Sequence, residues 1–213
     1  MSVRRLPVYI LLDTSGSMRG EPIHSVNVGL QAMLSALRQD PHALESVCLS
    51  VITFDIEATE YIPLTPLDEV HLGEVVAPEA GATFMGAALE LLIACVNRDV
   101  VRNTAERKGD WRPLLFIMTD GSPSDAHAYR QAIPIVKSLN FGTIVGCAAG
   151  PKAKREFLLE LTDRVATLDT LDSAAFSGFF KWVSASVVAG SSSSGVSGQV
   201  ALPAPPAEVN LAL

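Results

Sequence analysis

The stretch Asp13-Thr14-Ser15-Gly16-Ser17 carries the side chains of this sequence that are best suited to chemistry. An apolar run, residues 8–12, precedes it; the run is short and rich in strand-forming residues, which predicts a buried β-strand. Asp13, Ser15 and Ser17 then lie on the loop after that strand, and a curled loop lets their oxygen atoms meet at one point. Oxygen ligands alone suit a hard cation such as Mg²⁺ and not Zn²⁺.

A second apolar run, residues 113–119, also stops at a carboxylate, Asp120, which a glycine and a serine follow. A third loop, residues 81–86, contains two glycines and leads into a helix. If the two strands are neighbours where the strand order reverses, their loops face one crevice at the carboxyl ends of the strands. We therefore predict a divalent-cation site formed by Asp13, Ser15, Ser17, Thr83 and Asp120.

A simpler interpretation of these carboxylates also stays open. An Asp at the end of a strand, followed by Ser or Gly, is often only a helix cap or an Asx turn. We interpret Asp55 as a turn residue and expect Ser124 or Asp125 to cap the helix that follows them. Ser122 and Ser124 either donate hydrogen bonds to the residues that hold the cation or have no role there.

Apolar strands that alternate with helices predict an α/β fold of three layers, Rossmann-like, with helices on both faces of a mostly parallel sheet of about six strands. Pro134 is expected to kink or end its helix. The expected strands are residues 8–12, 47–54, 58–64, 113–119, 143–149 and 165–168. Helices are expected at residues 21–39, around 87–96, from 124–125 to about 139, at 152–161 and after 172.

The composition fits one folded domain and a tail. A chain of 213 residues with 48% hydrophobic residues is long enough to bury a substantial core. We place the domain at residues 6–189. From Gly190 on, Ser, Gly, Pro and Ala predict a flexible tail, residues 190–213. The last five residues, 209–213, either form a short docking motif or fray.

Charge, cysteines and the N-terminus limit location and partners. The net charge of −7 disfavours a general nucleic-acid binder. Cys48, Cys95 and Cys147 lie far apart in apolar runs and match no zinc motif, so we interpret them as reduced core residues, which suits the cytoplasm. Residues 1–12 lack the features of a signal peptide, and no segment approaches the roughly 20 apolar residues of a membrane span. We expect a cytoplasmic protein.

Three parts of the predicted site together resemble a known motif. Asp13-Thr14-Ser15-Gly16-Ser17, the later Thr83, and Thr119-Asp120-Gly121 are similar to the metal-ion-dependent adhesion site of von Willebrand factor A (vWA) domains. The resemblance covers residues 6 to about 189. The stretches 12–23, 116–125 and 176–183 further resemble bacterial tellurium-resistance-associated vWA proteins of the TerY type.

This resemblance has implications for fold, site and partners. It implies a sheet with one antiparallel edge strand, which residues 58–64 fit. It implies that Ser15 and Ser17 hold Mg²⁺ (or Mn²⁺ or Ca²⁺) directly, while Asp13, Thr83 and Asp120 act directly or through water. An Asp or Glu of a protein partner would complete the coordination, without catalysis. It also implies an adaptor in a tellurite-resistance and stress-response signalling system, with a protein kinase and a PP2C-type phosphatase as partners.

Two other functions stay as alternatives. A Mg²⁺-dependent phosphoryl-transfer enzyme also places an Asp at a strand end, but aspartate-nucleophile enzymes need a second Asp two residues later, where Ser15 stands. Lys152 and Lys154 are expected to open a later helix rather than to steady a phosphate here. A structural scaffold with an empty site is the second alternative. The sequence contains no glycine-rich nucleotide-binding motif and no Gly-x-Ser-x-Gly.

Overall fold

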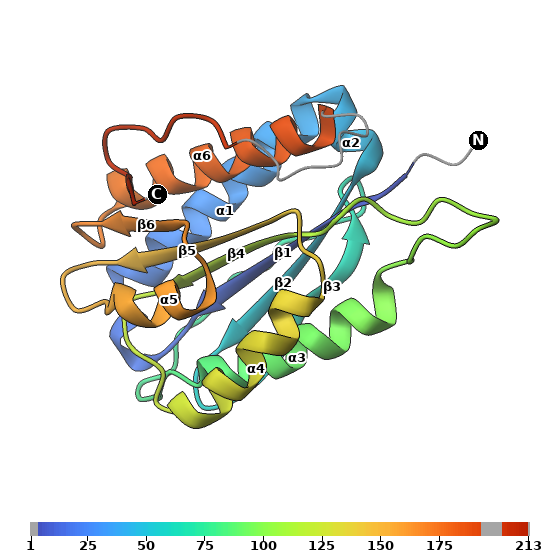
Figure 1. Cartoon of the computed structure of the whole chain (residues 1–213). Helices are drawn as coiled ribbons and strands as arrows, with labels where there is room; N and C mark the ends of the chain where they lie inside the picture. The colour runs from blue at the N-terminus through green and yellow to red at the C-terminus, as the bar shows by residue number, and fades with distance from the viewer. Residues whose placement is uncertain (1–3, 193–201, 213) are drawn as a thin grey trace.

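The computed structural model describes residues 4–192 and 202–212. Its elements follow one another as strand and helix in alternation over most of the chain (Figure 1). The strands are β1 (Leu6–Asp13), β2 (Val47–Phe54), β3 (Ala58–Pro66), β4 (Leu114–Thr119), β5 (Thr143–Ala149), β6 (Val165–Leu168) and β7 (Asn210–Ala212). The helices are α1 (Glu21–Gln39), α2 (Pro41–Ser46), α3 (Met85–Asp99), α4 (Ala126–Ser138), α5 (Arg155–Leu161) and α6 (Ser173–Ser192), with a 3₁₀ turn at Gly16–Met18.

The strands form one sheet in the order β3-β2-β1-β4-β5-β6-β7. The five strands from β2 to β6 in this order run parallel, and β3 and β7 pair antiparallel at the two edges. The strand order reverses at β1, which has β2 on one side and β4 on the other. The crevice that such a reversal opens at the carboxyl ends of the strands therefore lies between β1 and β4.

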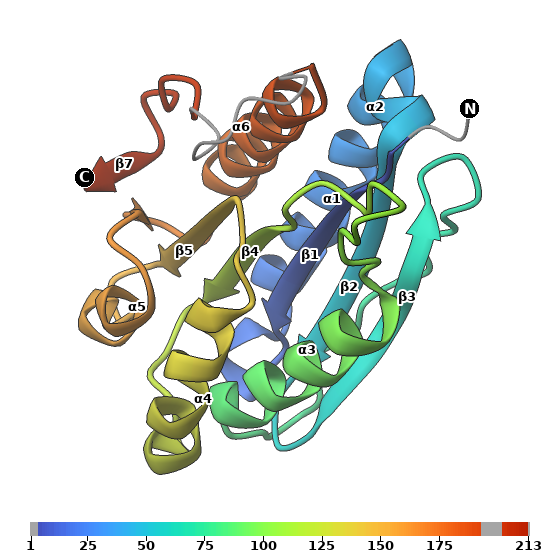
Figure 2. The same cartoon turned by 45° about the vertical axis from the view of Figure 1, so that its right-hand side comes forward.

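Helices cover both faces of the sheet. Figure 2 shows α1, α2 and α6 on one face and α3, α4 and α5 on the other. Alternate residues of β1 enter two separate cores: Val8, Ile10 and Leu12 pack under α1 and α6, while Tyr9 and Leu11 pack under α3 and α4. Because successive side chains of a strand point to opposite faces, a strand buried on both faces appears in the sequence as a continuous apolar run.

The expected α/β fold is confirmed, with differences in detail. The sheet has seven strands rather than about six, because residues 210–212 pair with β6. Pro134 neither ends nor divides α4, and α5 begins at Arg155, so Lys152 and Lys154 precede the helix instead of opening it. A short helix, α2, was not anticipated; the Asp40 side chain caps it by accepting a hydrogen bond from Ala43 N–H at 2.8 Å.

The prediction of a flexible tail over residues 190–213 is wrong for the two ends of that stretch. Residues 190–192 continue α6, and residues 202–212 lie against the domain and end in β7. Val209 is buried there, which removes the reason to expect fraying. Residues 193–201 and 213 lie outside the described residues, and the domain boundary at residue 189 stays a prediction.

Candidate metal site

The carboxyl ends of β1 and β4 place two loops side by side. In the paired register of the two strands, Leu12 lies opposite Met118, so Asp13 and Thr119 are the next residues on neighbouring strands. The Thr119 hydroxyl donates a hydrogen bond to Asp13 Oδ2 at 2.6 Å, and Ser15 N–H donates to Asp13 Oδ1 at 2.8 Å. The Asp13 carboxylate is therefore held in one orientation by a contact within its loop and a contact from the next strand.

The loop after Asp13 curls into the 3₁₀ turn at Gly16–Met18, which brings the two serines together. Ser15 Oγ lies 3.2 Å from Ser17 Oγ, and Ser17 Oγ donates to Asp120 Oδ1 at 2.9 Å. These contacts link the loops after β1 and β4, although Ser17 and Asp120 are 103 positions apart in the chain. The oxygen atoms of the Asp13 loop and of Asp120 thus form one cluster of polar atoms.

Thr83 reaches the same place from the irregular segment before α3. Its hydroxyl lies beside the backbone of the Asp120 loop: a Cβ atom placed on Gly121 would be 3.2 Å from Thr83 Oγ1. Ser124 fixes the Thr83 backbone from both sides, accepting from Thr83 N–H at 3.2 Å and donating its own N–H to the Thr83 carbonyl at 2.9 Å. All five predicted residues therefore come together, and that they bind a metal stays a prediction.

Burial sets the electrostatics of the two carboxylates. Asp13 is 1% exposed, and its pKa is raised to about 6, chiefly because burial removes water from the charged form; hydrogen bonds from Ser15 and Thr119 oppose this shift. Burial also raises the pKa of Asp120, against the hydrogen bond from Ser17 and the positive charge of Lys152. Among the described residues, neither carboxylate forms an ion pair.

This donor set fits a hard divalent cation. It consists of hydroxyl and carboxylate oxygens, the ligand types that Mg²⁺, Mn²⁺ and Ca²⁺ prefer. Two desolvated carboxylates that form no ion pair among the described residues are costly in a folded protein, and a bound cation would offset that cost. Residues 4–192 and 202–212 contain no cluster of three or more His, Cys, Asp or Glu side chains that could hold a metal, and this site is not such a cluster because three of its five donors are hydroxyls.

Other predicted residues have different roles from those expected. Asp125 precedes α4 but does not cap it with its side chain. Its carboxylate instead caps α3, accepting from Gly86 N–H at 3.0 Å and Ala87 N–H at 2.9 Å. The prediction that Asp125 caps α4 with its side chain is wrong, because a helix cap supplied from another part of the chain leaves no local signal in the sequence. Asp55 is a turn residue as expected, since it accepts from Glu57 N–H.

Sequence reasoning missed Thr119 as a side chain that orients Asp13. Thr119 belongs to the motif Thr119-Asp120-Gly121, but a threonine at the end of a buried strand is an ordinary strand residue, so its type and position do not indicate this role. Ser124 supports the Thr83 loop, whereas Ser122 makes no side-chain hydrogen bond within the part of the chain that the structure describes.

The chain belongs to the von Willebrand factor type A domain family, whose model matches residues 8–175. Solved structures with the same fold include proximal thread matrix protein 1 from the mussel byssus with a zinc-occupied MIDAS motif, the metal-ion-dependent adhesion site (15% identity, TM-score 0.60, 85% of this chain and 48% of that one). Another is a von Willebrand factor type A protein from Catenulispora acidiphila (17% identity, TM-score 0.58, 88% of this chain and 43% of that one). A third is the manganese-loaded TRAP protein of Plasmodium vivax (23% identity, TM-score 0.52, 72% of this chain and 61% of that one).

At these identities the likeness shows the fold alone. The chain spans about half the length of the mussel protein that it resembles. A search of curated proteins finds no match. None of the helices in the described ranges is long and apolar enough to cross a membrane.

Proposed function

We propose that this chain is a protein-binding module that depends on a divalent cation. Asp13, Ser15, Ser17, Thr83 and Asp120 would hold the ion, and a carboxylate from a partner's Asp or Glu would complete its coordination. The observation that carries this proposal is that three loops at the sheet reversal bring together three hydroxyl side chains and two buried carboxylates that form no ion pair among the described residues. The zinc-occupied MIDAS motif named for the mussel protein and the manganese named for the Plasmodium vivax protein, both of the same fold, support it.

The chemistry of the site explains why a partner carboxylate is the expected ligand. Mg²⁺ takes six oxygens, and five protein groups leave room for one more. Because three of the five are neutral hydroxyls, the bound ion would keep net positive charge and attract an anionic group. A carboxylate on a partly desolvated cation makes a strong, charge-assisted contact. In this proposal the residues of this chain would hold and orient the ion and would take no part in breaking a bond in the partner.

Metal titration tests this function directly. We expect calorimetry to show one Mg²⁺ or Mn²⁺ site per chain, lost in Asp13→Ala and kept in Asp163→Ala, which removes an exposed carboxylate outside the site. Partner capture from a lysate of the source organism should require the metal, stop with chelator and fail with Asp13→Ala. Capture that persists under both treatments would reject the proposal.

We extend the proposal to the cellular context from the sequence resemblance alone. The chain would act in the cytoplasm as an adaptor in a tellurite-resistance and stress-response system, bringing together a protein kinase and a PP2C-type phosphatase. Mass spectrometry of the metal-dependent fraction from that capture tests this context, because a kinase or phosphatase should be present with the unmodified chain and absent with Asp13→Ala.

One observation favours a second function, Mg²⁺-dependent phosphoryl transfer. The positive charge of Lys152 lowers the pKa of Asp120, against the effect of burial, so a cationic side chain of the chain does act on a carboxylate of the site. Against it, Ser15 still stands where an aspartate-nucleophile enzyme needs an acid–base group. Hydrolysis of p-nitrophenyl phosphate that requires Mg²⁺ and disappears in both Asp13→Asn and Lys152→Ala would support this alternative.

A further inference from the structure

A second feature of the molecule, away from the metal site, is the way that residues 202–212 are attached to the domain; we name them the C-terminal segment. They run back along α6 toward its first turn and then add β7 to the sheet (Figures 1 and 2). The register pairs Asn210 with Thr167, Leu211 with Ala166 and Ala212 with Val165. This end of the chain behaves as a bound peptide that continues a sheet by one strand.

The groove that holds the C-terminal segment is formed by β6 and α6. The Trp182 indole N–H donates to the Pro203 carbonyl at 2.9 Å, which fixes the start of the segment. Further along, Gly178 leaves room for the Glu208 side chain, since a Cβ atom on that glycine would lie 3.3 Å from Glu208 Cβ. Val209, 2% exposed, is the buried anchor. Contacts of three kinds therefore give this groove a defined occupant.

The sequence of the C-terminal segment favours docking in this groove. Prolines at 203, 205 and 206 limit the conformations open to the free segment and so reduce the entropy lost when it docks. The apolar residues Leu202, Val209 and Leu211 pack against the core beneath α6. If the segment left, β6 would become an edge strand with unpaired backbone groups, a surface that readily accepts another strand.

The attachment of the segment to its own domain depends on a short connection. Nine residues, 193–201, join α6 to Leu202, and five of the nine are Ser or Gly. The contacts of the segment named above all go to residues between Val165 and Trp182. Nothing in these contacts distinguishes the segment of the same molecule from that of another, and exchange of identical elements is a low-cost route to dimers.

We propose that the C-terminal segment is an exchangeable docking element, and that the groove between β6 and α6 takes the same segment from a second copy of this chain. The contact is separate from the proposed function, because it uses no residue of the metal site. Because the segment is tethered to its own domain, its effective concentration at the groove is about 1 mM. At protein concentrations below that value, the unmodified chain therefore binds its own segment. Exchange then appears when self-docking is blocked.

Two complementary full-length variants test the proposal. Val209→Asp removes the buried anchor but leaves the groove intact. Gly178→Trp fills the seat of Glu208 but leaves the segment intact. Each variant alone should be monomeric, and a mixture at about 100 µM, below the tether's effective concentration, should form a one-to-one heterodimer by sedimentation, with or without chelator. A mixture that stays monomeric overturns the proposal.

Matched controls keep the result interpretable. Ala204→Asp adds the same charge at an exposed position of the segment, so its groove stays filled and its mixture with Gly178→Trp should remain monomeric. A chain with both Val209→Asp and Gly178→Trp should not pair with either variant; pairing there would mean a different contact and would reject the proposal. If Val209→Asp does not fold by circular dichroism, Leu211→Asp replaces it.

A labelled peptide gives an independent measurement. A fluorescent peptide with the sequence of residues 202–212 should bind Val209→Asp at least tenfold more tightly than it binds the unmodified chain, whose groove is occupied. Gly178→Trp should not bind it. Equal, weak binding to all three proteins would count against the proposal even if the mixture formed a dimer.

Discussion

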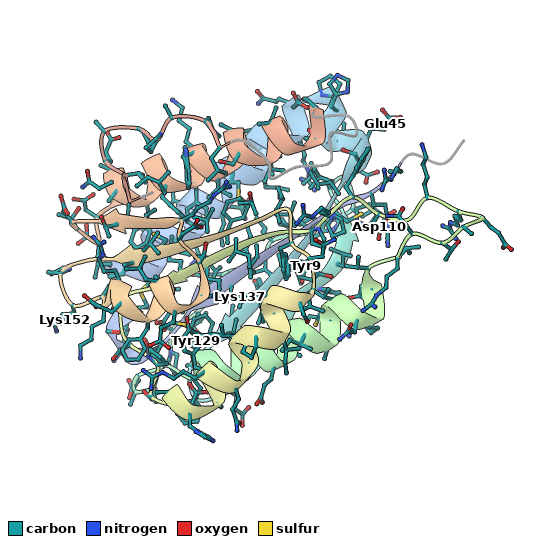
Figure 3. The ribbon with its side chains drawn as sticks, viewed as in Figure 1. Tyr9, Glu45, Asp110, Tyr129, Lys137 and Lys152 are labelled. Carbon is teal, nitrogen blue, oxygen red and sulfur yellow. The ribbon has the colours of Figure 1, made fainter. Side chains whose placement is uncertain are left out.

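The two ends of β1 carry two buried carboxylate sites that differ in whether an arginine donates to the carboxylate. At the amino end, Asp110 accepts from Arg5 Nε at 3.0 Å, from Arg5 Nη2 at 2.7 Å and from Val101 N–H at 2.8 Å. At the carboxyl end, the donors to Asp13 within the described residues are neutral ones, Ser15 N–H and the Thr119 hydroxyl. Figure 3 shows Asp110 at the base of the loop that projects from one end of the molecule and Lys152 at the other end.

This difference separates a carboxylate that an arginine of the chain neutralises from a carboxylate that forms no ion pair among the described residues. The pKa of the Arg5 guanidinium is raised, first by its hydrogen bond to Asp110 and against the effect of burial, so that pair is complete within the chain. The pKa of Asp13 is raised to about 6, chiefly by burial, and no ion pair with a described residue compensates the water that its charge loses. A buried carboxylate without a cation is where we expect a ligand cation to bind.

The largest expected effect breaks the carboxyl-end site. Asp13→Ala removes a charged donor, so we expect Mn²⁺ affinity to fall more than about 100-fold, beyond the 10–100-fold losses caused by changes around a metal site. Asp110→Ala should leave Mn²⁺ affinity within about twofold, because its carboxylate is used by Arg5. Calorimetric titration of both variants measures the contrast, and equal losses would mean that the two ends do not differ as described.

The next effect breaks the amino-end site. Asp110→Ala leaves the Arg5 guanidinium and Val101 N–H without their shared acceptor. We expect the free energy of unfolding to drop by about 2 kcal/mol, at the lower end for a broken pair because the Arg5 side chain is 39% exposed. Urea unfolding with unchanged m-value measures this loss. A change below about 0.5 kcal/mol, the usual range for surface substitutions, would contradict it.

A smaller effect with the opposite sign is expected at Asp13 when no metal is present. The folded pKa of about 6 lies above the ordinary value near 3.9, so ionised Asp13 costs stability as pH rises through 6, and the cost is absent below pH 4. Asp13→Asn should therefore stabilise the chelated protein by about 1–2 kcal/mol at pH 7.5. Thermal unfolding from pH 4 to 7.5 should show this difference vanish toward acid pH.

The smallest effect sharpens the role of Thr119. Thr119→Val removes the hydroxyl that orients Asp13, and we expect metal affinity to fall about tenfold. In the unmodified chain the hydrogen bond from Thr119 lowers the pKa of Asp13. The substitution should therefore raise that pKa and move the pH midpoint of metal binding upward. A variant that weakens binding without moving the midpoint would show that Thr119 acts only by packing.

Much of the fold followed from local patterns. Residues 8–12 before Asp13 and residues 113–118 before Thr119 and Asp120 form two apolar runs, and they become strands buried on both faces. Helix α1 begins at Glu21–Pro22 and ends before Asp40–Pro41, as the prolines indicated. The site residues Asp13, Ser15 and Ser17 could be selected because strand ends and alternating oxygen donors are visible within a few positions.

The remaining features depend on contacts between distant parts of the chain. Asp125 caps α3 rather than α4, and Thr119 orients a carboxylate 106 positions away. The C-terminal segment has a composition typical of a flexible tail, yet its contacts with α6 and β6 hold it in place. No local signal distinguishes these outcomes, because each depends on which surfaces the folded sheet and helices bring together.

By itself, the sequence determined which segments are buried strands and which loops carry oxygen donors, since burial period and strand ends are properties of neighbouring residues. Only the tertiary structure decided that β1 lies between β2 and β4, that Thr83 joins Asp13 and Asp120, and that Asp13 has no cation among the described residues. Those facts depend on packing over about a hundred positions of chain, where the free energy of burying whole faces outweighs any local preference.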